Sequence, residues 1–442
     1  MERKYSLQLE RGGQGRITAK NENVNGWPVS WEYRYDGAGR LAGVNRDGAG
    51  VELYLYDAQD RRAEDYVPLR GQMDRVFRYG PDNRLLQAGD ARYEHDSKGF
   101  RSRKVTPQGE TRYHYAPDYR LLAVELPDGR VVEYAHDEQG LRNAKYVDGR
   151  LTERFHWHDR AHLAAWSHAD LAGGQWWEVV YGRDGRPMGL VTQDHGQGQG
   201  QGAEILLHTD QIGSVRMVEF PTEGMVKEIL YDAFGNVVRD GNPYLRSPLG
   251  FAGGLHDWDT GLVRFGWRDY DPDTGRFTAQ DPIGAAGGDP DWYGYCLDDP
   301  VNGRDPEGLS SVEYNDEEKE IVLRAANGTS WDFPADNRTV RGHAHYPSGN
   351  FPFAWHSEHD GADENSSYGS NGNFIFDVKG RTGMGVHAGR ANKGGIHHPT
   401  YGCIRTTDTA TNKMSEVHKV DPLSKLYVRH AEDDLDPESW GR

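Results

Sequence analysis

Cys403 is one of two cysteines in this chain of 442 residues, and it lies in the stretch HHPTYGCIRTTD. A thiol becomes a nucleophile when an imidazole or a cation lowers its pKa and a substrate can reach it. His387 lies upstream, near the end of a predicted strand, and Arg405 follows two residues after the cysteine, on the same side of an extended segment. Gly402 leaves space beside the sulfur and offers backbone donors to an oxyanion. These residues are compatible with a Cys–His nucleophile pair, but taken alone they favour an inert structural cysteine. Cys296 is predicted to pack in a core.

Two Asp-Pro-x-Gly groups form a second candidate site. DPIG begins at Asp281 and DPEGL at Asp305, and Arg268 precedes both. Asp-Pro-x-Gly is a good turn former, which is one interpretation. Two carboxyl groups held close together offer another, because one stays protonated as an acid while the other activates a water molecule. An arginine would hold the ionised partner, and spacing alone leaves both interpretations open.

Histidines of the C-terminal part indicate a third kind of chemistry, which is metal binding. Two pairs have the spacing of metal ligands and two more histidines are adjacent. They are His343 and His345, His356 and His359, and His397 and His398. A metal-dependent nuclease or hydrolase is therefore an alternative. The chain has 51 Lys+Arg against 69 Asp+Glu, a net charge of −18, so it lacks the basic surface that neutralises phosphates. We therefore expect no metal, no cofactor and no nucleic-acid partner.

The elements that must position these residues are predicted to be mainly β. Gly (56), Tyr (24) and Trp (12) are abundant, as expected for short strands joined by tight turns. Units such as YRYDGAGRL and YLYDAQDRR recur through the first half, each with an aromatic run, an Asp, a turn and an Arg. Such a unit is too short to bury a face alone, so neighbouring hairpins must stack. No apolar run is long enough for a membrane span, and the first residues lack the apolar core of a signal peptide.

These repeats resemble the YD-repeat, or RHS, family, and the resemblance sharpens in YDAFGNV (231–237), in residues 250–284 and in DPVNGRDPEGL (299–309). It implies a spiral of β-hairpins that forms a shell around a C-terminal toxin. We accordingly expect YD repeats over 1–249, a core-associated autoproteolytic domain over 250–309 and a toxin domain over 310–442. The number of repeats predicts a partial shell, a short member of the family or a fragment of a longer protein.

The same resemblance assigns the two Asp-Pro-x-Gly groups to self-cleavage. RHS proteins of this type resemble aspartyl autoproteases that cut themselves after the Leu of DPxGL. The matching residues are Arg268, Asp281 and Asp305, and the bond expected to be cut is Leu309–Ser310.

Residues 310–442 are predicted to form a small β-rich domain with about one helix, over 409–420. EKEIVLRAANGTSWDFPAD predicts two strands, and GNFIFDVKGRTGMGVHAG predicts two more. GVHAGRANKGGIHHPTYGCIRTTD resembles the L,D-transpeptidase (YkuD-like) signature, and HYPSGNFPF (345–353) resembles the substrate-side strand of such domains.

On this resemblance Cys403 is the nucleophile, His387 is the general base, and Arg405 steadies the site or a substrate carboxylate. Ala388 stands where another residue often orients the imidazole, so the orientation must come from the Ala388 backbone carbonyl.

The expected substrate is a peptidoglycan stem peptide. The thiolate attacks the carbonyl of a meso-diaminopimelate residue and releases the terminal D-Ala, and water, a D-amino acid or another stem's amine resolves the thioester. Thr400, Tyr401 and Tyr346 are expected to contact this substrate.

The two resemblances together imply an antibacterial effector that a specialised apparatus secretes without a signal peptide and that acts in the periplasm of a target cell. Its expected partners are an immunity protein and the secretion apparatus or a chaperone, and we expect no membrane insertion. A non-enzymatic surface contact protein, in which the repeats are the function, is the remaining alternative.

Overall fold

The computed structural model divides the chain into two compact units. Unit 1 comprises Met1–Asp281 and Pro290–Gly308, and unit 2 comprises Pro282–Asp289 and Leu309–Arg442. The structure describes residues 4–13, 15–170, 174–182, 185–192, 204–281, 291–305, 311–315, 319–324, 330–337, 346, 349–357, 368, 370–378, 381, 384–388, 403–420, 423 and 425–429. Within these ranges no helix is both long enough and apolar enough to cross a lipid bilayer. The predicted division into three domains stays a prediction.

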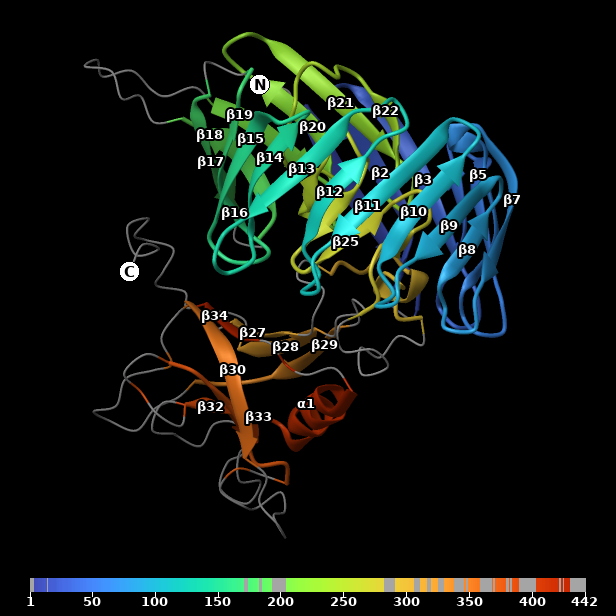
Figure 1. Cartoon of the computed structure of the whole chain (residues 1–442). Coiled ribbons are helices and arrows are strands. Elements are labelled where there is room, and N and C mark those ends of the chain that lie inside the picture. Colours follow the sequence, from blue (N-terminus) through green and yellow to red (C-terminus); the bar gives the residue numbers. More distant parts are fainter. Residues whose placement is uncertain are drawn as a thin grey trace, which may run out of the picture. The chain divides into compact units, whose positions relative to one another are not determined.

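Unit 1 contains one large antiparallel sheet that accounts for 22 strands of the described chain, each paired with the next in sequence (Figure 1). The strands are β1 Tyr5–Arg11, β2 Ile17–Val24, β3 Trp27–Tyr35, β4 Leu41–Arg46, β5 Ala49–Tyr56, β6 Arg62–Val67, β7 Gln72–Tyr79, β8 Leu85–Ala88, β9 Ala91–His95, β10 Arg101–Thr106, β11 Gly109–Tyr115, β12 Leu121–Glu125, β13 Val131–His136, β14 Arg142–Val147, β15 Arg150–Trp157, β16 Leu163–His168, β17 Trp176–Tyr181, β18 Pro187–Val191, β19 Glu204–Thr209, β20 Val215–Phe220, β21 Met225–Tyr231 and β22 Val237–Asp240. A short 3-10 turn, η1 (Pro68–Arg70), joins β6 to β7. The prediction of a mainly β chain built from successive hairpins is confirmed.

Each repeat stacks on the next through its Asp, its Arg and an aromatic residue. At the first complete repeat, Asp36 Oδ1 accepts the backbone N–H of Arg40 at 3.0 Å, and Gly39 adopts a φ of 90° that a glycine accepts without strain. The Arg40 guanidinium lies over the Tyr56 ring of the next repeat, 4.4 Å from its centroid, and the Tyr56 hydroxyl donates to the Leu41 carbonyl at 2.7 Å. The same aspartate cap recurs at Asp57, Asp96, Asp137, Asp210 and Asp232.

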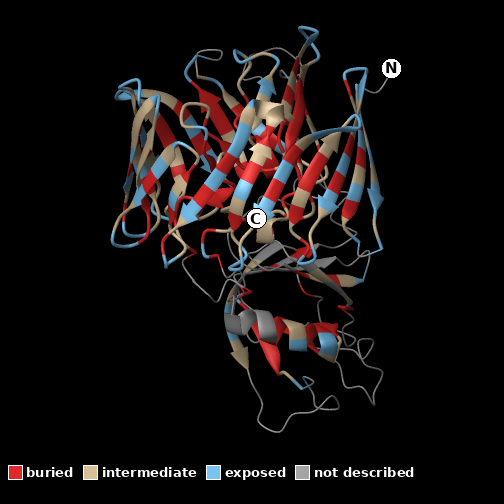
Figure 2. Ribbon diagram, turned by 90° about the vertical axis from the view of Figure 1, so that its right-hand side faces the viewer, coloured by how far each residue is buried: buried red, intermediate tan, exposed pale blue. Residues whose placement is uncertain are grey.

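The inner face of this sheet is covered by residues 249–281 and 291–305 of the same unit. Strands alternate between buried and exposed residues, as Figure 2 shows. The covering segment contains η2 (Phe251–Gly253), η4 (Cys296–Asp298) and a four-stranded sheet of β23 (Leu255–His256), β24 (Val263–Phe265), β25 (Arg268–Asp271) and β26 (Arg276–Phe277). Its apolar side chains join those of β15–β21 in one core cluster, which includes Cys296 and so confirms that this cysteine packs in a core.

Buried ion pairs fasten the covering segment to the strands around it. The Arg142 guanidinium on β14 donates to Asp269 on β25 at 2.9 Å, and Arg75 on β7 donates to Asp273 at 2.8 Å. Lys145, also on β14, donates to Asp257 at 2.9 Å. The shell strands therefore supply cations and the segment supplies carboxylates. Removing one partner would leave a buried charge without compensation, so these pairs tie the folding of both parts together.

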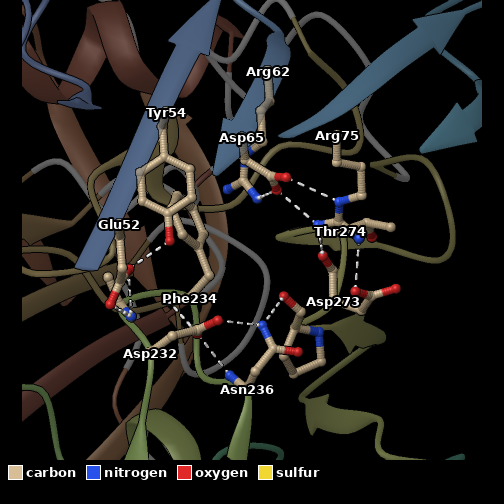
Figure 3. A network of polar contacts seen from close by, with 12 residues as sticks. Glu52, Tyr54, Arg62, Asp65, Arg75, Asp232, Phe234, Asn236, Asp273 and Thr274 are labelled. Carbon is tan, nitrogen blue, oxygen red and sulfur yellow. Dashed lines mark hydrogen bonds and ion pairs between the residues drawn. The ribbon is translucent and has the colours of Figure 1, made fainter. Parts of the chain in front are cut away.

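Early and late strands of the large sheet meet through side chains. Arg216 on β20 donates to Glu22 on β2 at 3.1 Å. Figure 3 shows a second such contact, in which Glu52 on β5 accepts the Ala233 backbone N–H at 3.1 Å and the Tyr54 hydroxyl at 2.5 Å. We call this contact, made by Glu52 and Tyr54 on β5 with the Asp232–Ala233 turn, the seam.

Unit 2 contains an eight-stranded sheet within its described residues and one helix, α1 (Asp408–Val420). The sheet order is β29 (Ser330–Pro334), β28 (Glu320–Arg324), β27 (Ser311–Asn315), β34 (Lys425–Arg429), β30 (Gly349–Ser357), β31 (Asn373–Phe376), β32 (Gly385–Ala388) and β33 (Ile404–Thr406). The helix and both predicted strand pairs are confirmed, with β28 antiparallel to β29 and β31 antiparallel to β32. The Gly-Gln tract (196–202), whose composition predicts a flexible loop, and the acidic tail (431–442), predicted to be exposed, lie outside the described residues.

Candidate functional sites

Arg268, Asp281 and Asp305 come together in unit 1. Arg268 begins β25, and its guanidinium lies 3.7 Å from the centroid of the Phe277 ring on β26. One nitrogen, Nη2, lies 3.0 Å from Asp281 Oδ2 and 3.4 Å from Asp305 Oδ2. Residues far apart in the sequence thus share one cation, and all three are buried.

The surrounding backbone holds both carboxylates in place. The Asp281 N–H donates to the Trp292 carbonyl at 2.7 Å, which ties the end of the β26 segment to the start of 291–305. The η4 turn follows, with Cys296 buried in it, and Asp305 ends the same segment. Such a pair around one guanidinium has the parts needed for acid–base chemistry on a nearby peptide bond. Leu309 and Ser310 lie outside the described residues.

His387 lies on β32 in unit 2, and Cys403 directly precedes the adjacent parallel strand β33. His387 pairs with Arg405 on β33. Asn373 on β31 pairs with His387 from the other side. Paired residues on neighbouring strands project from the same face, so Asn373, His387 and Arg405 form one row across three strands. All three are buried, whereas Cys403 is partly exposed.

The His387 imidazole is held in one orientation and one tautomer. Its Nδ1 lies 2.8 Å from the Ala388 carbonyl, and because a carbonyl only accepts, Nδ1 carries the proton. The prediction that the Ala388 carbonyl orients the imidazole is confirmed. The Tyr368 ring packs edge-on against the imidazole, 4.9 Å between centroids. Nε2 is therefore the nitrogen that remains to accept a proton.

Burial keeps both partners of the Cys–His pair neutral at neutral pH. Burial, together with the nearby Arg405 charge, lowers the pKa of His387 to about 4, against the hydrogen bond to the Ala388 carbonyl. Burial also raises the pKa of the Cys403 thiol, against four opposing influences: the Gly385 backbone N–H, Arg405, Arg381 and the Asn373 side chain. Cys403 therefore rests as a thiol and His387 as a neutral imidazole, which is the protonation state that a general base needs to accept a thiol proton.

Sequence reasoning missed Asn373, Gly385 and Arg381 as neighbours of the sulfur. Gly385 has no space for a side chain, since a Cβ there would lie 2.2 Å from Asn373 Oδ1 and 2.5 Å from the Phe374 carbonyl oxygen. The glycine thus lets Asn373 lie close to the backbone that donates to Cys403. The glycine two residues before His387 is the sequence signal that indicates such close packing.

Of the three residues predicted to contact the substrate, the structure describes only Tyr346. Tyr346 is fully buried in the core cluster of unit 2 and packs edge-on against Phe351 at 5.3 Å. Burial raises the pKa of Tyr346, and the Cys403 thiolate, where it forms, raises it as well. Thr400, Tyr401 and Gly402 lie outside the described residues. Their roles stay predictions.

The histidine cluster can be followed only at His356. Its Nε2 lies 2.5 Å from the Asn371 carbonyl, and its ring stacks on Phe374 at 4.0 Å. Among the residues that the structure describes, no group of three or more His, Cys, Asp and Glu side chains could hold a metal ion. The other five histidines of the cluster lie outside that part of the chain.

Three known proteins show a similar sequence. Teneurin-4 of Mus musculus is 26% identical over 282 residues, which is 63% of this chain and 10% of that protein. The probable deoxyribonuclease RhsB of Dickeya dadantii is 28% identical over 347 residues, 68% of this chain and 23% of that protein. Double-stranded DNA deaminase toxin A of Burkholderia cenocepacia is 30% identical over 323 residues, 63% of this chain and 22% of that protein. The chain thus spans less than a quarter of the length of each.

Among solved structures, the crystal structure of TcdB2-TccC3 without its hypervariable C-terminal region aligns with 69% of this chain and 21% of that chain. The TM-score is 0.30 and the identity 15%, which is too low to support a conclusion. The model of the teneurin YD-shell family matches residues 1–285, which contain the whole 22-stranded sheet. The chain therefore belongs to the teneurin YD-shell family.

Proposed function

We propose that this chain is an antibacterial YD-shell effector that cleaves itself after Leu309 and carries a C-terminal cysteine acyl transferase of the L,D-transpeptidase class. Two of the similar bacterial proteins are named as a deoxyribonuclease and a DNA deaminase toxin, which supports a toxin role for this chain. The activity itself is argued from unit 2, because toxins on a common shell differ in their chemistry.

The observation that carries the self-cleavage proposal is the shared Arg268 nitrogen between Asp281 and Asp305. One carboxylate takes a proton from a water molecule, whose oxygen adds to the Leu309 carbonyl carbon. The other carboxyl group donates a proton to the Ser310 nitrogen as the peptide bond breaks. The products are a Leu309 carboxylate and a free Ser310 amine.

Asp281→Asn should leave one band of full length on a denaturing gel, whereas the purified wild-type chain should give two. The exposed Asp74 on β7 provides the control, and Asp74→Asn should cleave like the wild type. A split Asp281→Asn chain would show that the assignment is wrong.

The observation that carries the acyl-transfer proposal is the row of Asn373, His387 and Arg405 beside the partly exposed Cys403. His387 Nε2 takes the thiol proton while the sulfur attacks the diaminopimelate carbonyl. The tetrahedral intermediate collapses, the amide bond to D-Ala breaks, and the imidazolium returns the proton to the leaving amine. Water, a D-amino acid or another stem's amine then resolves the thioester.

Expression of the chain in a bacterial periplasm should yield muropeptides that lack the terminal D-Ala or carry a foreign D-amino acid. Cys403→Ala should abolish this change and Cys296→Ala should not, because Cys296 is buried in unit 1. His387→Gln should reduce the change by a factor of about 100 or more, the usual contribution of a general base. An unaltered wall profile with the wild-type chain would end the proposal.

A metal-dependent nuclease remains the second candidate function, supported by the name of the Dickeya relative. One assay of growth arrest or substrate turnover, run with each inhibitor, distinguishes the two chemistries. Activity that survives EDTA but is lost to a thiol alkylator supports Cys403, and the opposite pattern supports the metal enzyme.

A further inference from the structure

The first repeat turn, GGQGR (12–16), closes like the later turns but contains no carboxylate. The Gly12 N–H donates to the Arg16 carbonyl at 2.8 Å, as the Asp36 N–H does to the Arg40 carbonyl at 3.0 Å. In five later turns that end in an arginine, this arginine pairs with an aspartate of its own turn. The pairs are Arg40 with Asp36, Arg61 with Asp57, Arg84 with Asp82, Arg120 with Asp118 and Arg130 with Asp128. Arg16 instead donates through Nε to Asp299 Oδ2 at 3.1 Å, in the segment that covers the inner face of the sheet.

Asn302, in the same segment, contacts the first repeat through both ends of its amide. Its Oδ1 accepts the Ile17 backbone N–H at 2.8 Å, and its Nδ2 donates to the Tyr35 hydroxyl at 2.9 Å and to Asp299 Oδ1 at 2.8 Å. The Tyr35 hydroxyl donates in turn to the Ile17 carbonyl at 2.7 Å. A carboxamide has one acceptor oxygen and two N–H donors, so an asparagine makes all three contacts, whereas an aspartate or an apolar residue does not.

The turn that holds Asp299 and Asn302 is fixed by further contacts. Val301 is buried in one core cluster with Ile17 at the start of β2. The Val301 carbonyl accepts Gln211 Nε2 at 3.0 Å, from the turn between β19 and β20. The Gly303 N–H donates to the Asp299 carbonyl at 3.0 Å and so closes the turn over 299–303. Early and late repeats therefore hold this turn from two sides.

Asp305 of the candidate self-cleavage site follows this turn directly. Two residues separate Asn302 from Asp305, whose Oδ2 lies 3.4 Å from Arg268 Nη2. A displacement of the turn by about 1 Å would take this carboxylate out of hydrogen-bond reach of the guanidinium. The contacts of the turn with the first repeat thus bear on the geometry of the site.

We infer that Asn302 is a positioning residue of the self-cleavage site, which docks the 299–303 turn on the first repeat and so fixes Asp305 beside Arg268. The inference rests on the proposed self-cleavage. Cleavage then depends on residues of β2 and β3, and the chain is cut only once the first repeat and the covering segment have come together. An aspartate at position 12 would compete with Asp299 for Arg16 Nε, because the equivalent Nε of Arg40 binds Asp36 at 2.7 Å.

The test measures the half-time of self-cleavage in a cell-free translation of the full chain, followed on denaturing gels after synthesis is stopped. Tyr35→Phe removes the hydroxyl that Asn302 contacts, and should slow cleavage about fivefold, the effect of one lost hydrogen bond. The matched control is Tyr56→Phe, which loses the equivalent hydrogen bond of the next repeat, to the Leu41 carbonyl at 2.7 Å. It should cleave at the wild-type rate.

Melting temperatures separate positioning from general stabilisation. Measured in the uncleaved Asp281→Asn background, they should fall by similar amounts in Tyr35→Phe and Tyr56→Phe, because each loses one hydrogen bond between neighbouring repeats. A residue that merely stabilised the fold would slow cleavage equally in both variants, and that result would overturn the inference.

Two variants at Asn302 complete the test. Asn302→Ala loses all three contacts and should slow cleavage about tenfold or more. Asn302→Asp keeps the shape but loses both donors, and should also slow cleavage. The double variant Tyr35→Phe/Asn302→Ala should be no slower than Asn302→Ala, because both changes act through one contact. A slower double variant would show that Tyr35 acts by another route and would contradict the inference.

Failure of this inference can be told from failure of the self-cleavage proposal. If Asp281→Asn still cleaves, the self-cleavage assignment is wrong. If Asp281→Asn is blocked while Asn302→Ala and Tyr35→Phe cleave at the wild-type rate, the positioning role of Asn302 is refuted.

Discussion

Glu52→Gln should remove a pH dependence of stability that comes from the seam. Glu52 on β5 and Asp232, in the turn between β21 and β22, are both fully buried in the same network (Figure 3). Burial, together with the Asp232 charge, raises the pKa of Glu52 from 4.5 to about 8, against the Tyr54 and Ala233 hydrogen bonds and the Arg70 charge. Glu52 therefore carries a proton in the folded chain at neutral pH.

The sign follows from the two pKa values. Below pH 4.5 the carboxyl group is protonated in both states, and between 4.5 and 8 only the unfolded chain releases the proton, so stability falls as pH rises. Between pH 6 and pH 9 the expected loss is about 2.5 kcal/mol, from 1.36 kcal/mol per pKa unit over the part of the shift that lies above pH 6. Above about pH 9 both states are ionised and the loss stops.

The assay is urea unfolding of wild type and Glu52→Gln, followed by tryptophan fluorescence at pH 6 and pH 9. Other groups titrate in both chains, so the quantity compared is the difference in unfolding free energy between them. That difference should shift by about 2.5 kcal/mol in favour of Glu52→Gln as the pH rises. The control Glu32→Gln, at an exposed site on β3, should give a constant difference. If the difference in unfolding free energy between wild type and Glu52→Gln also stayed constant, Glu52 would not be protonated in the folded chain at pH 6.

Two further predictions concern the ion pairs and the thiol. Asp269→Asn should destabilise unit 1 by about 3–5 kcal/mol in urea unfolding, because Arg142 and Arg264 both lose a buried carboxylate; an effect below about 1 kcal/mol would contradict that role. Asn373→Ala should slow alkylation of Cys403 by iodoacetamide about tenfold at pH 8, because the Asn373 side chain stabilises the thiolate and the variant loses this hydrogen bond. An unchanged rate would show that Asn373 does not act on the sulfur.

The repeats could be predicted because their signals are local. Asp36, Gly39 and Arg40 lie within one turn, and the hydrogen bonds that close it join residues at most four apart. The carboxylate that pairs with each buried Arg or Lys of the shell strands could not be predicted in this way. Arg142 meets Asp269 only after several hairpins have stacked, and no spacing in the sequence encodes that contact.

In the candidate sites too, residues within a motif could be predicted, whereas residues that only the fold brings together could not. The resemblance supplied Arg268, Asp281 and Asp305, and the fold brings them together. Asn373 was missed because an asparagine inside a strand has no local signature. It reaches Cys403 through the register of β31 on β32, which depends on the whole sheet.

The most direct test of the account is mass spectrometry of the full chain after incubation with a disaccharide tetrapeptide that ends in D-Ala. We expect free D-Ala in solution and an acyl group bound to the peptide that contains Cys403, and we expect neither with Cys403→Ala. Release of D-Ala by Cys403→Ala, or no release and no adduct with the wild-type chain, would contradict the proposal that Cys403 is the nucleophile.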